Sequence, residues 1–231
     1  MSLSIGLITI NSKFVHLALS LRYLRNAARK AGFGDVWLRE YTLKTPGWKM
    51  AAELATLIPQ SKRTVLGFSV YIWNRAETFA LIERLKKQDP ALVIVVGGPE
   101  VSFESAPPTP YIDYVIGGEG ERKWVECLQH VAEGRSPDAA TLTRWRTHGT
   151  DLPELEESPY TEEDLPGLAH RLVYLETSRG CPYTCSFCLS ALDEKVRFYP
   201  DAQVKDDIRR LIAAGGRKIK FLDRTFNLRK N

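Results

Sequence analysis

The stretch LVIVVGG (92–98) joins a short apolar run to a pair of glycines, and apolar runs of this kind recur along the first half of the chain. A segment with helical spacing of its apolar residues follows each of the first three runs. The five runs lie at 4–10, 35–43, 64–72, 92–98 and within 111–120. Strands that alternate with helices pair in parallel through crossover connections. Residues 1–135 are therefore predicted to form an α/β domain, a five-stranded, doubly wound parallel sheet of the flavodoxin or Rossmann type.

The first of the predicted helices covers residues 13–32. Phe14, Leu17, Leu21 and Leu24 share one face at this spacing, and Gly32 is the expected end of the helix. A later helix is expected over 76–88, and Asn74 stands where an N-cap residue would be.

Glycines follow the last two predicted strands, at Gly97–Gly98 and at Gly117, Gly118 and Gly120. In an open parallel sheet the carboxyl ends of the strands form the ligand-binding edge. Gly97–Gly98 would let the backbone approach a large flat ligand without a Cβ atom in the way. The Gly118–Glu121 turn leads into a helix N-terminus, which suits polar or anionic groups. Glu119 and Glu121 are either an acid–base pair or acidic residues of a first helical turn, and the second interpretation is preferred.

The composition excludes several classes of protein. Of 231 residues, 44% are hydrophobic and 26% charged, which favours a folded core over disorder. The net charge of +4 is small and spread along the chain, so no nucleic-acid partner is indicated. No apolar run approaches the ~20 residues that span a membrane. The N-terminal MSLSIGLITINSK lacks a basic leader and a cleavage site, so we expect a cytoplasmic protein.

Residues 136–168 are rich in Pro, Asp and Glu and are expected to be a linker, with a small hairpin around Gly149. A second unit is expected over 169–231: a strand at 171–179, a helix at 201–216 and a strand at 218–227. The expected apolar face of this helix carries Val204, Ile208, Leu211 and Ile212. Because one β-α-β piece is too small to bury a sheet on both faces, we expect the chain to be the front of a longer protein.

Three of the four cysteines lie in GCPYTCSFC (180–188), with the spacing C-x3-C-x2-C. Three neighbouring thiols cannot all pair as disulfides, so a metal site is preferred. Cys181, Cys185 and Cys188 could hold three irons of a four-iron cluster and leave the fourth iron open. The alternative is zinc with a remote fourth ligand, either a histidine or Cys127, but no second C-x2-C pair is present. Cys127, between apolar residues of a predicted helix, is more simply a buried thiol.

The stretch LETSRGCPYTCSFC (175–188) resembles the radical S-adenosylmethionine (SAM) superfamily, whose signature is C-x3-C-x-aromatic-C. The resemblance implies that Cys181, Cys185 and Cys188 bind a 4Fe-4S cluster on a partial (βα)6, TIM-like barrel, of which 169–231 is the start. SAM then chelates the fourth iron, and the reduced cluster cleaves it to a 5′-deoxyadenosyl radical.

The same resemblance gives two further residues a role. Phe187, in the aromatic position, would lie near the adenine of SAM, and the alternative is simple core packing. Asp223, at the end of a barrel strand, would hold the ribose or the methionine end of SAM. Its alternatives are a helix cap or a salt bridge with Arg224.

VVGGPEVSF (95–103) and DYVIGGEGE (113–121), ahead of the cysteine motif, resemble the radical SAM proteins that carry an N-terminal cobalamin (vitamin B12)-binding domain. FLDRTFN (221–227) resembles their second barrel strand. The resemblance implies cobalamin as a cofactor, and the residues expected to contact it are Ser69, Asn74, Gly97, Gly98, Gly118, Glu119 and Gly120. Tyr71 and Trp73 are either core residues or a lid over the flat ring.

One departure concerns the cobalt ligand. Many cobalamin domains carry D-x-H-x-x-G, whose histidine ligates cobalt, whereas here the loop reads NSKFVH (11–16). Asn11 and Lys13 stand in the Asp and His positions, and His16 is expected on the first helix. Bound cobalamin would then lack a histidine on its lower face.

The expected function is reductive cleavage of SAM followed by radical chemistry, with methyl transfer through cobalamin as the expected subclass. An external electron donor, flavodoxin or ferredoxin, is implied, and the substrate is not identified. Two alternatives remain: a cobalamin-binding or scaffold module with an inactive truncated barrel, and a structural zinc protein.

Overall fold

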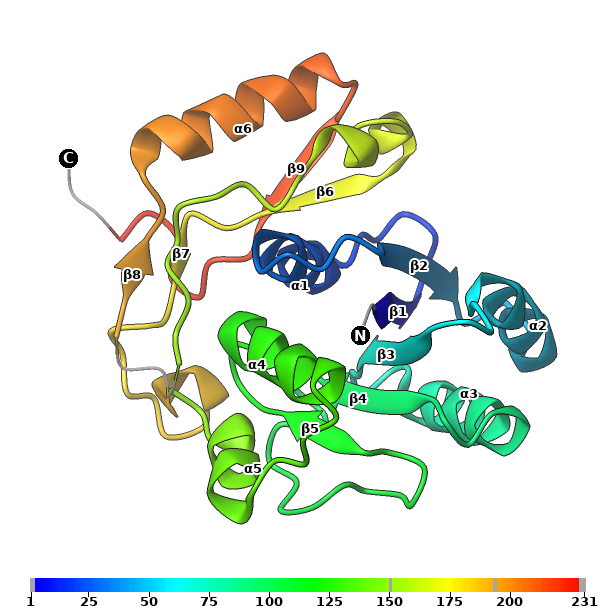
Figure 1. Ribbon diagram of the computed structural model, residues 1–231. Helices are drawn as coiled ribbons and strands as arrows, with labels where there is room; N and C mark the ends of the chain where they lie inside the picture. The colour runs from blue at the N-terminus through cyan, green and yellow to red at the C-terminus, as the bar shows by residue number, and fades with distance from the viewer. Residues whose placement is uncertain (1–2, 150, 193–194, 229–231) are drawn as a thin grey trace. The chain divides into compact units, whose positions relative to one another are not determined.

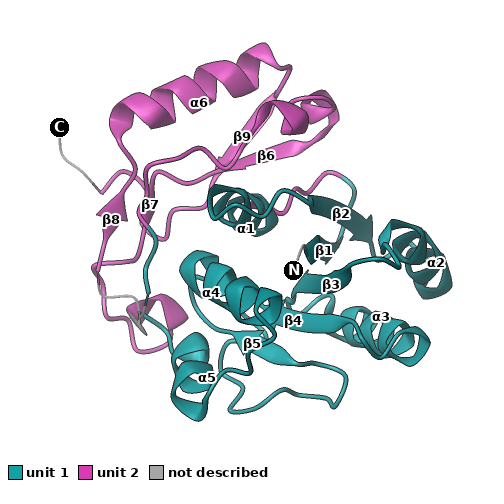
Figure 2. Cartoon of the chain, in the orientation of Figure 1, with its two compact units in different colours: residues 1–14, 20–153 teal, residues 15–19, 154–231 magenta. Residues whose placement is uncertain are grey.

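The computed structural model describes residues 3–149, 151–192 and 195–228, and the chain divides into two compact units (Figure 2). Unit 1 comprises Met1–Phe14 and Ser20–Pro153, and unit 2 comprises Val15–Leu19 and Glu154–Asn231. The first unit thus extends beyond the boundary expected near residue 135. None of the helices described has the length and apolar character needed to cross a membrane.

Unit 1 is built on a parallel sheet of five strands in the order β2-β1-β3-β4-β5 (Figure 1). The strands are β1 (Leu3–Asn11), β2 (Val36–Thr42), β3 (Arg63–Ser69), β4 (Val93–Gly97) and β5 (Tyr114–Ile116). The order reverses between β1 and β3, which is the switch point where open sheets bind ligands at the carboxyl ends of their strands. The predicted five-stranded, doubly wound fold is confirmed.

Helices cover both faces of this sheet, with α2 and α3 on one side and α1 and α4 on the other (Figure 1). The helices of the unit are α1 (Leu19–Lys30), α2 (Gly47–Leu57), α3 (Arg75–Gln88), α4 (Glu121–Ala132) and α5 (Ala139–Arg146). The main core joins side chains of β1, β3 and β4 to Met50, Leu54, Leu81 and Leu85 of α2 and α3. Each such fully buried side chain stabilises the fold by roughly 1.5–3 kcal/mol.

Two expectations for unit 1 are wrong in detail. The predicted helix over 13–32 begins only at Leu19, and Phe14, which matched its apolar spacing, is 63% exposed. Its end is as predicted, because Gly32 adopts a positive φ of 91° that closes the helix. The expected hairpin around Gly149 is replaced by helix α5. The Asp138 side chain caps that helix by accepting a hydrogen bond from the Thr141 N–H at 2.8 Å.

Unit 2 contains a parallel pair, β6 (Leu172–Leu175) with β9 (Lys218–Phe221), joined through α6 (Asp201–Ala213). A short antiparallel pair, β7 (Ser178–Arg179) with β8 (Arg197–Phe198), lies between them in sequence. Single helical turns occur at Glu162–Asp164, Leu168–His170 and Leu189–Leu192. Of the expected barrel, the described part of unit 2 contains this one β-α-β crossover.

The buried face of α6 differs from the predicted one. Leu211 is buried as expected, but Ile212 is 58% exposed and Asp207 is buried instead. The predicted face was too wide, because Asp207 and Leu211 are spaced four residues apart and share one side of the helix, whereas Ile212 lies beyond its edge.

Candidate cofactor sites

Large apolar side chains are exposed on three loops that follow the sheet strands of unit 1. Phe14 follows β1, Ile72 and Trp73 follow β3, and Phe103 follows β4. The carboxyl ends of parallel strands meet at one edge of the sheet, so these side chains belong to that edge. The Tyr71 and Trp73 rings stack at 4.5 Å with an interplanar angle of 7°. An exposed apolar surface at this edge suits a large, partly apolar ligand.

Asn74 and Ser69 shape the loop after β3 from the inside. Asn74 is fully buried, and its Nδ2 donates hydrogen bonds to the carbonyls of Ile10 (3.0 Å) and Ser69 (3.2 Å). Its Oδ1 accepts a hydrogen bond from the Tyr71 N–H at 2.8 Å. Asn74 is the N-cap residue of α3, but its side chain makes no capping hydrogen bond, because these contacts already engage it. Both residues therefore support the position of Tyr71–Trp73.

The glycine pair after β4 serves a close contact between two backbone segments. Gly98 has a φ of 107°, and a Cβ atom there would lie 2.5 Å from the Val70 carbonyl oxygen. The Val70 N–H also donates a hydrogen bond to the Gly97 carbonyl at 2.7 Å. The physical reason for Gly98 is thus the approach of the β3–α3 loop, where the sequence had suggested the approach of a ligand.

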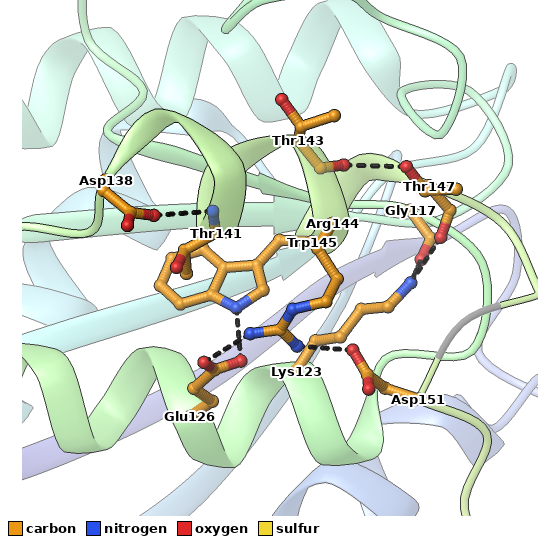
Figure 3. Close-up of polar contacts among 10 residues, drawn as sticks. All are labelled: Gly117, Lys123, Glu126, Asp138, Thr141, Thr143, Arg144, Trp145, Thr147 and Asp151. Carbon is orange, nitrogen blue, oxygen red and sulfur yellow. Dashed lines mark hydrogen bonds and ion pairs between the residues drawn. The ribbon is translucent and has the colours of Figure 1, made fainter.

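The turn after β5 is held by the C-terminal end of α5. The Gly117 N–H donates a hydrogen bond to the Trp145 carbonyl at 2.9 Å. Lys123, on α4, is fully buried and donates hydrogen bonds from its Nζ to the carbonyls of Gly117 (2.8 Å) and Thr147 (2.6 Å) (Figure 3). A Cβ atom at Gly117 would overlap the Arg146 carbonyl, so the end of α5 can pack against this turn only because residue 117 is glycine.

The rest of this turn lies further toward solvent. Gly118 is exposed, with a φ of 67°, and Glu119 is half-buried. Gly120 is the N-cap residue of α4, and Glu121 begins the helix, as expected for an acidic residue in a first turn. The His148 ring, close to Gly118, stacks on Phe103 at 4.6 Å. This stacking links the end of α5 to the loop after β4.

An ionic network fixes α5 on α4 (Figure 3). Arg144 pairs with Glu126 and with Asp151, each at 2.5 Å, and the Trp145 Nε1 donates a hydrogen bond to Glu126 at 2.7 Å. Burial acts to raise the pKa of Glu126, but the hydrogen bonds from Arg144 and Trp145 outweigh it and hold that pKa below its usual value. The network makes α5 part of the wall around the β5 turn.

The cysteine loop in unit 2 follows β7. Cys181 is half-buried, Cys185 and Cys188 are exposed, and all three are free thiols. Across the described residues, no group of three or more His, Cys, Asp or Glu side chains is placed to hold a metal ion. Hydrogen bonds from the Ser190 side chain and backbone lower the pKa of Cys188. The donor set, three free thiols within eight residues, suits an iron–sulfur cluster, since thiolates are its usual ligands.

Asp223, which follows β9, braces the start of this loop. Its Oδ1 accepts hydrogen bonds from the backbone N–H groups of Thr177 (2.8 Å) and Ser178 (2.5 Å) and from both hydroxyls (3.0 Å each). Its Oδ2 is buried and has no hydrogen-bond partner among the residues that the structure describes. The sequence had not suggested this bracing role.

The sequence assigned a role to Phe187 in this loop and none to Thr225, which follows β9. Phe187 is 91% exposed, which excludes core packing and leaves its contact with the adenine of SAM a prediction. Thr225, which the sequence analysis missed, places its Oγ1 3.3 Å from the Cys181 Sγ.

Cys127 and His16 have structural surroundings. Cys127 is fully buried on α4, and burial raises the pKa of its thiol, as expected for a buried, inert cysteine. His16 was expected on the first helix but precedes it. It pairs with Leu172 in an isolated β-bridge, and its Nδ1 lies 2.6 Å from the Tyr174 hydroxyl.

Residues 5–128 match the B12 binding domain family, which is more than half of the chain. The chain belongs to the B12-binding domain family. Two curated relatives are the cobalamin-dependent radical SAM methyltransferase TokK of Streptomyces tokunonensis (31% identical) and the 2-(S-pantetheinyl)-carbapenam-3-carboxylate methyltransferase of Streptantibioticus cattleyicolor (30%). Each alignment covers 62% of this chain and 25% of the relative. The resemblance to radical SAM proteins with a B12-binding domain is confirmed.

Solved structures of radical SAM enzymes share the fold. The radical SAM methyltransferase TsrM from Kitasatospora setae matches with a TM-score of 0.76 at 20% identity, over 99% of this chain and 48% of TsrM. OxsB, solved with aqua-cobalamin and SAM bound, matches with a TM-score of 0.71 at 19% identity, over 96% of this chain and 34% of OxsB. The chain therefore spans about a quarter of the curated relatives named above and a third to a half of these solved structures.

The B12-binding domain of this chain holds site features that sequence reasoning missed. Phe14, Ile72 and Phe103 gave a signal that could have been used, since large apolar residues stand in loops directly after buried strands. Lys123 gave none, because a lysine in an amphipathic helix is ordinarily solvated.

Proposed function

We propose that this chain supplies the B12-binding domain and the cluster-binding loop of a cobalamin-dependent radical SAM enzyme, with methyl transfer as its reaction class. One observation carries the proposal: the three-thiol loop, braced by Asp223, follows a B12-binding domain in the same chain. The methyltransferase names of two relatives support the reaction class.

The cobalamin would lie at the carboxyl edge of the sheet in unit 1. Ile72, Trp73 and Phe103 would provide apolar contacts for the corrin ring, and the turn Gly118–Gly120 would provide polar ones. The loops that carry these groups would be held in place by four residues beside them: Ser69, Asn74, Gly97 and Gly98. Lys13, in the place of the usual cobalt-binding histidine, leaves the lower face without an imidazole from that position of the loop.

The cluster and SAM would lie at the cysteine loop in unit 2. Cys181, Cys185 and Cys188 would hold a 4Fe-4S cluster. Phe187 would stack near the adenine, and the unpartnered Oδ2 of Asp223 would accept a hydrogen bond from a hydroxyl of SAM. When bound, the cluster supplies the electron that cleaves SAM, and cobalamin supplies the methyl-carrying metal. The electron would come from flavodoxin or ferredoxin, and the oxygen-labile cluster would require a reducing cytoplasm.

Anaerobic reconstitution with iron and sulfide, read by absorption and electron paramagnetic resonance (EPR), tests the cysteine assignment. We expect one 4Fe-4S cluster per chain, lost in Cys185→Ala and kept in Cys127→Ala, the matched control at the buried cysteine. Stoichiometric zinc in place of iron, or an intact cluster in Cys185→Ala, would refute the assignment.

A titration with aquacobalamin, followed by its absorption spectrum, tests the sheet edge. We expect saturable binding that Trp73→Ala weakens about 10-fold, through the loss of one buried aromatic contact worth roughly 1–2 kcal/mol. Trp48→Ala is the matched control, since Trp48 is an exposed tryptophan on α2. No spectral change in the wild type would reduce this domain to a scaffold.

A further inference from the structure

The segment after β9 holds the cysteine loop at two points. Asp223 accepts hydrogen bonds from Thr177 and Ser178, four and three residues before the first cysteine of the motif. Two positions further along, Thr225 contacts the cysteine itself, with 3.3 Å between its Oγ1 and the Cys181 Sγ. Asp223 therefore fixes the turn, and Thr225 is set opposite the Cys181 sulfur by the same short segment.

The direction of the Thr225–Cys181 hydrogen bond depends on the state of the sulfur. A free thiol can donate to the Thr225 hydroxyl, but a metal-bound thiolate has only lone pairs and can only accept. With a ligated Cys181, the Thr225 hydroxyl must therefore be the donor. Hydrogen bonds to the sulfurs of an iron–sulfur cluster are one of the properties that set its reduction potential. They stabilise the more negative, reduced state and so raise the potential.

We propose that Thr225 is a positioning residue whose hydroxyl donates a hydrogen bond to the ligating Cys181 sulfur and raises the reduction potential of the cluster. This inference rests on the proposed function, because it requires the cluster to be bound at the loop. Thr225 would thus affect how readily the cluster is reduced, without itself binding iron.

An EPR-monitored redox titration of the whole reconstituted chain, with dithionite as the reductant, tests the inference. Thr225→Val keeps the shape of the side chain and removes the hydroxyl, and Thr225→Ser keeps the hydroxyl. We expect the midpoint potential of Thr225→Val to shift to a more negative value, with unchanged iron content and cluster absorption. Thr225→Ser is expected to titrate with the wild type, a rescue that a purely steric role would not give.

The possible failures separate the inference from the proposed function. A cluster with the same midpoint potential in Thr225→Val and the wild type would overturn the role of Thr225 and leave the proposed function standing. Loss of the cluster in Thr225→Val would also overturn it, because the hydroxyl would then be needed for assembly. Failure of the wild type to assemble any cluster would overturn the proposed function, and the inference with it.

Discussion

The Lys123 ammonium lies 2.8 Å from the Gly117 carbonyl oxygen, and through this contact α4 holds the turn that follows β5. The same ammonium donates to the Thr147 carbonyl at 2.6 Å, so one buried side chain joins the turn to the end of α5. Lys123→Met keeps most of the apolar part of the side chain but leaves both carbonyls without this donor. We expect a loss of about 1–3 kcal/mol in the free energy of unfolding, the cost of unsatisfied buried polar groups, measured by urea denaturation.

Lys49→Met is the control for this prediction. Lys49 is exposed on α2, so its replacement is expected to change stability by no more than about 0.5 kcal/mol. Equal stability of the two variants would mean that the Lys123 contacts do not hold the turn.

Asp223→Asn removes the negative charge of the carboxylate whose Oδ1 accepts four hydrogen bonds. Because the Asn amide is neutral and charge-assisted hydrogen bonds are stronger than neutral ones, we expect a loss of about 1–3 kcal/mol in stability. The iron bound per chain after reconstitution is expected to fall with it, since the turn before Cys181 is no longer fixed. Asp206→Asn, at an exposed position of α6, is expected to match the wild type in both measurements. Unchanged iron content in Asp223→Asn would contradict the bracing role.

Gly98→Ala places a Cβ atom where the Val70 carbonyl lies 2.5 Å away, on a residue with a φ of 107°. The close contact and the positive φ both disfavour any side chain at this position. We therefore expect the free energy of unfolding to fall by about 1–3 kcal/mol. Gly34→Ala is the matched control, because nothing lies within 4 Å of the added atom there. Thermal unfolding followed by circular dichroism compares the two, and similar melting temperatures would contradict this explanation of Gly98.

The strands were predictable because each is a short apolar run between helical segments, and β1, β3 and β4 lie within a few residues of their expected positions. The start of α1 was not predictable from spacing alone. Phe14 has the right periodicity for the helix but lies in a loop and is exposed. Gly149, just beyond the end of α5, suggested a hairpin, whereas the residues before it form a helix that buries Trp145 and is capped by Asp138.

The candidate sites also contain some features that a local sequence pattern predicts and others that it does not. The cysteine motif is local, so its spacing alone is enough to predict the donor set. The bracing by Asp223 and the Thr225 contact are set by the pairing of β6 with β9, whose paired residues lie 46 positions apart in the sequence, and no local pattern reports such a pairing. The sequence pointed to the glycines after β4, but it suggested that Gly98 makes room for a ligand. In the structure the Val70 backbone fills the space that the missing side chain of Gly98 leaves.

The pH dependence of stability offers an independent test of Lys123. Burial, followed by the neighbouring charge of Arg144, lowers the pKa of Lys123 below its usual 10.5, against the opposing effect of Asp151, Glu119 and Glu121. Between the lowered pKa of the folded state and the unfolded value of 10.5, the unfolded chain binds more protons than the folded chain. The free energy of unfolding therefore rises with pH through this window, while below it the desolvation cost of the charged amine is fully present.

Lys123→Met cannot show that gain, whereas every other titrating group is common to both proteins. The stability difference between the wild type and Lys123→Met should therefore be larger at about pH 10 than at about pH 7, because the neutral amine keeps both hydrogen bonds without the cost of burying a charge. Urea denaturation at the two pH values measures this difference. A difference that stays constant or shrinks at the higher pH would show that folding does not lower the pKa of the Lys123 amine, and would contradict the desolvation of its ammonium against Gly117.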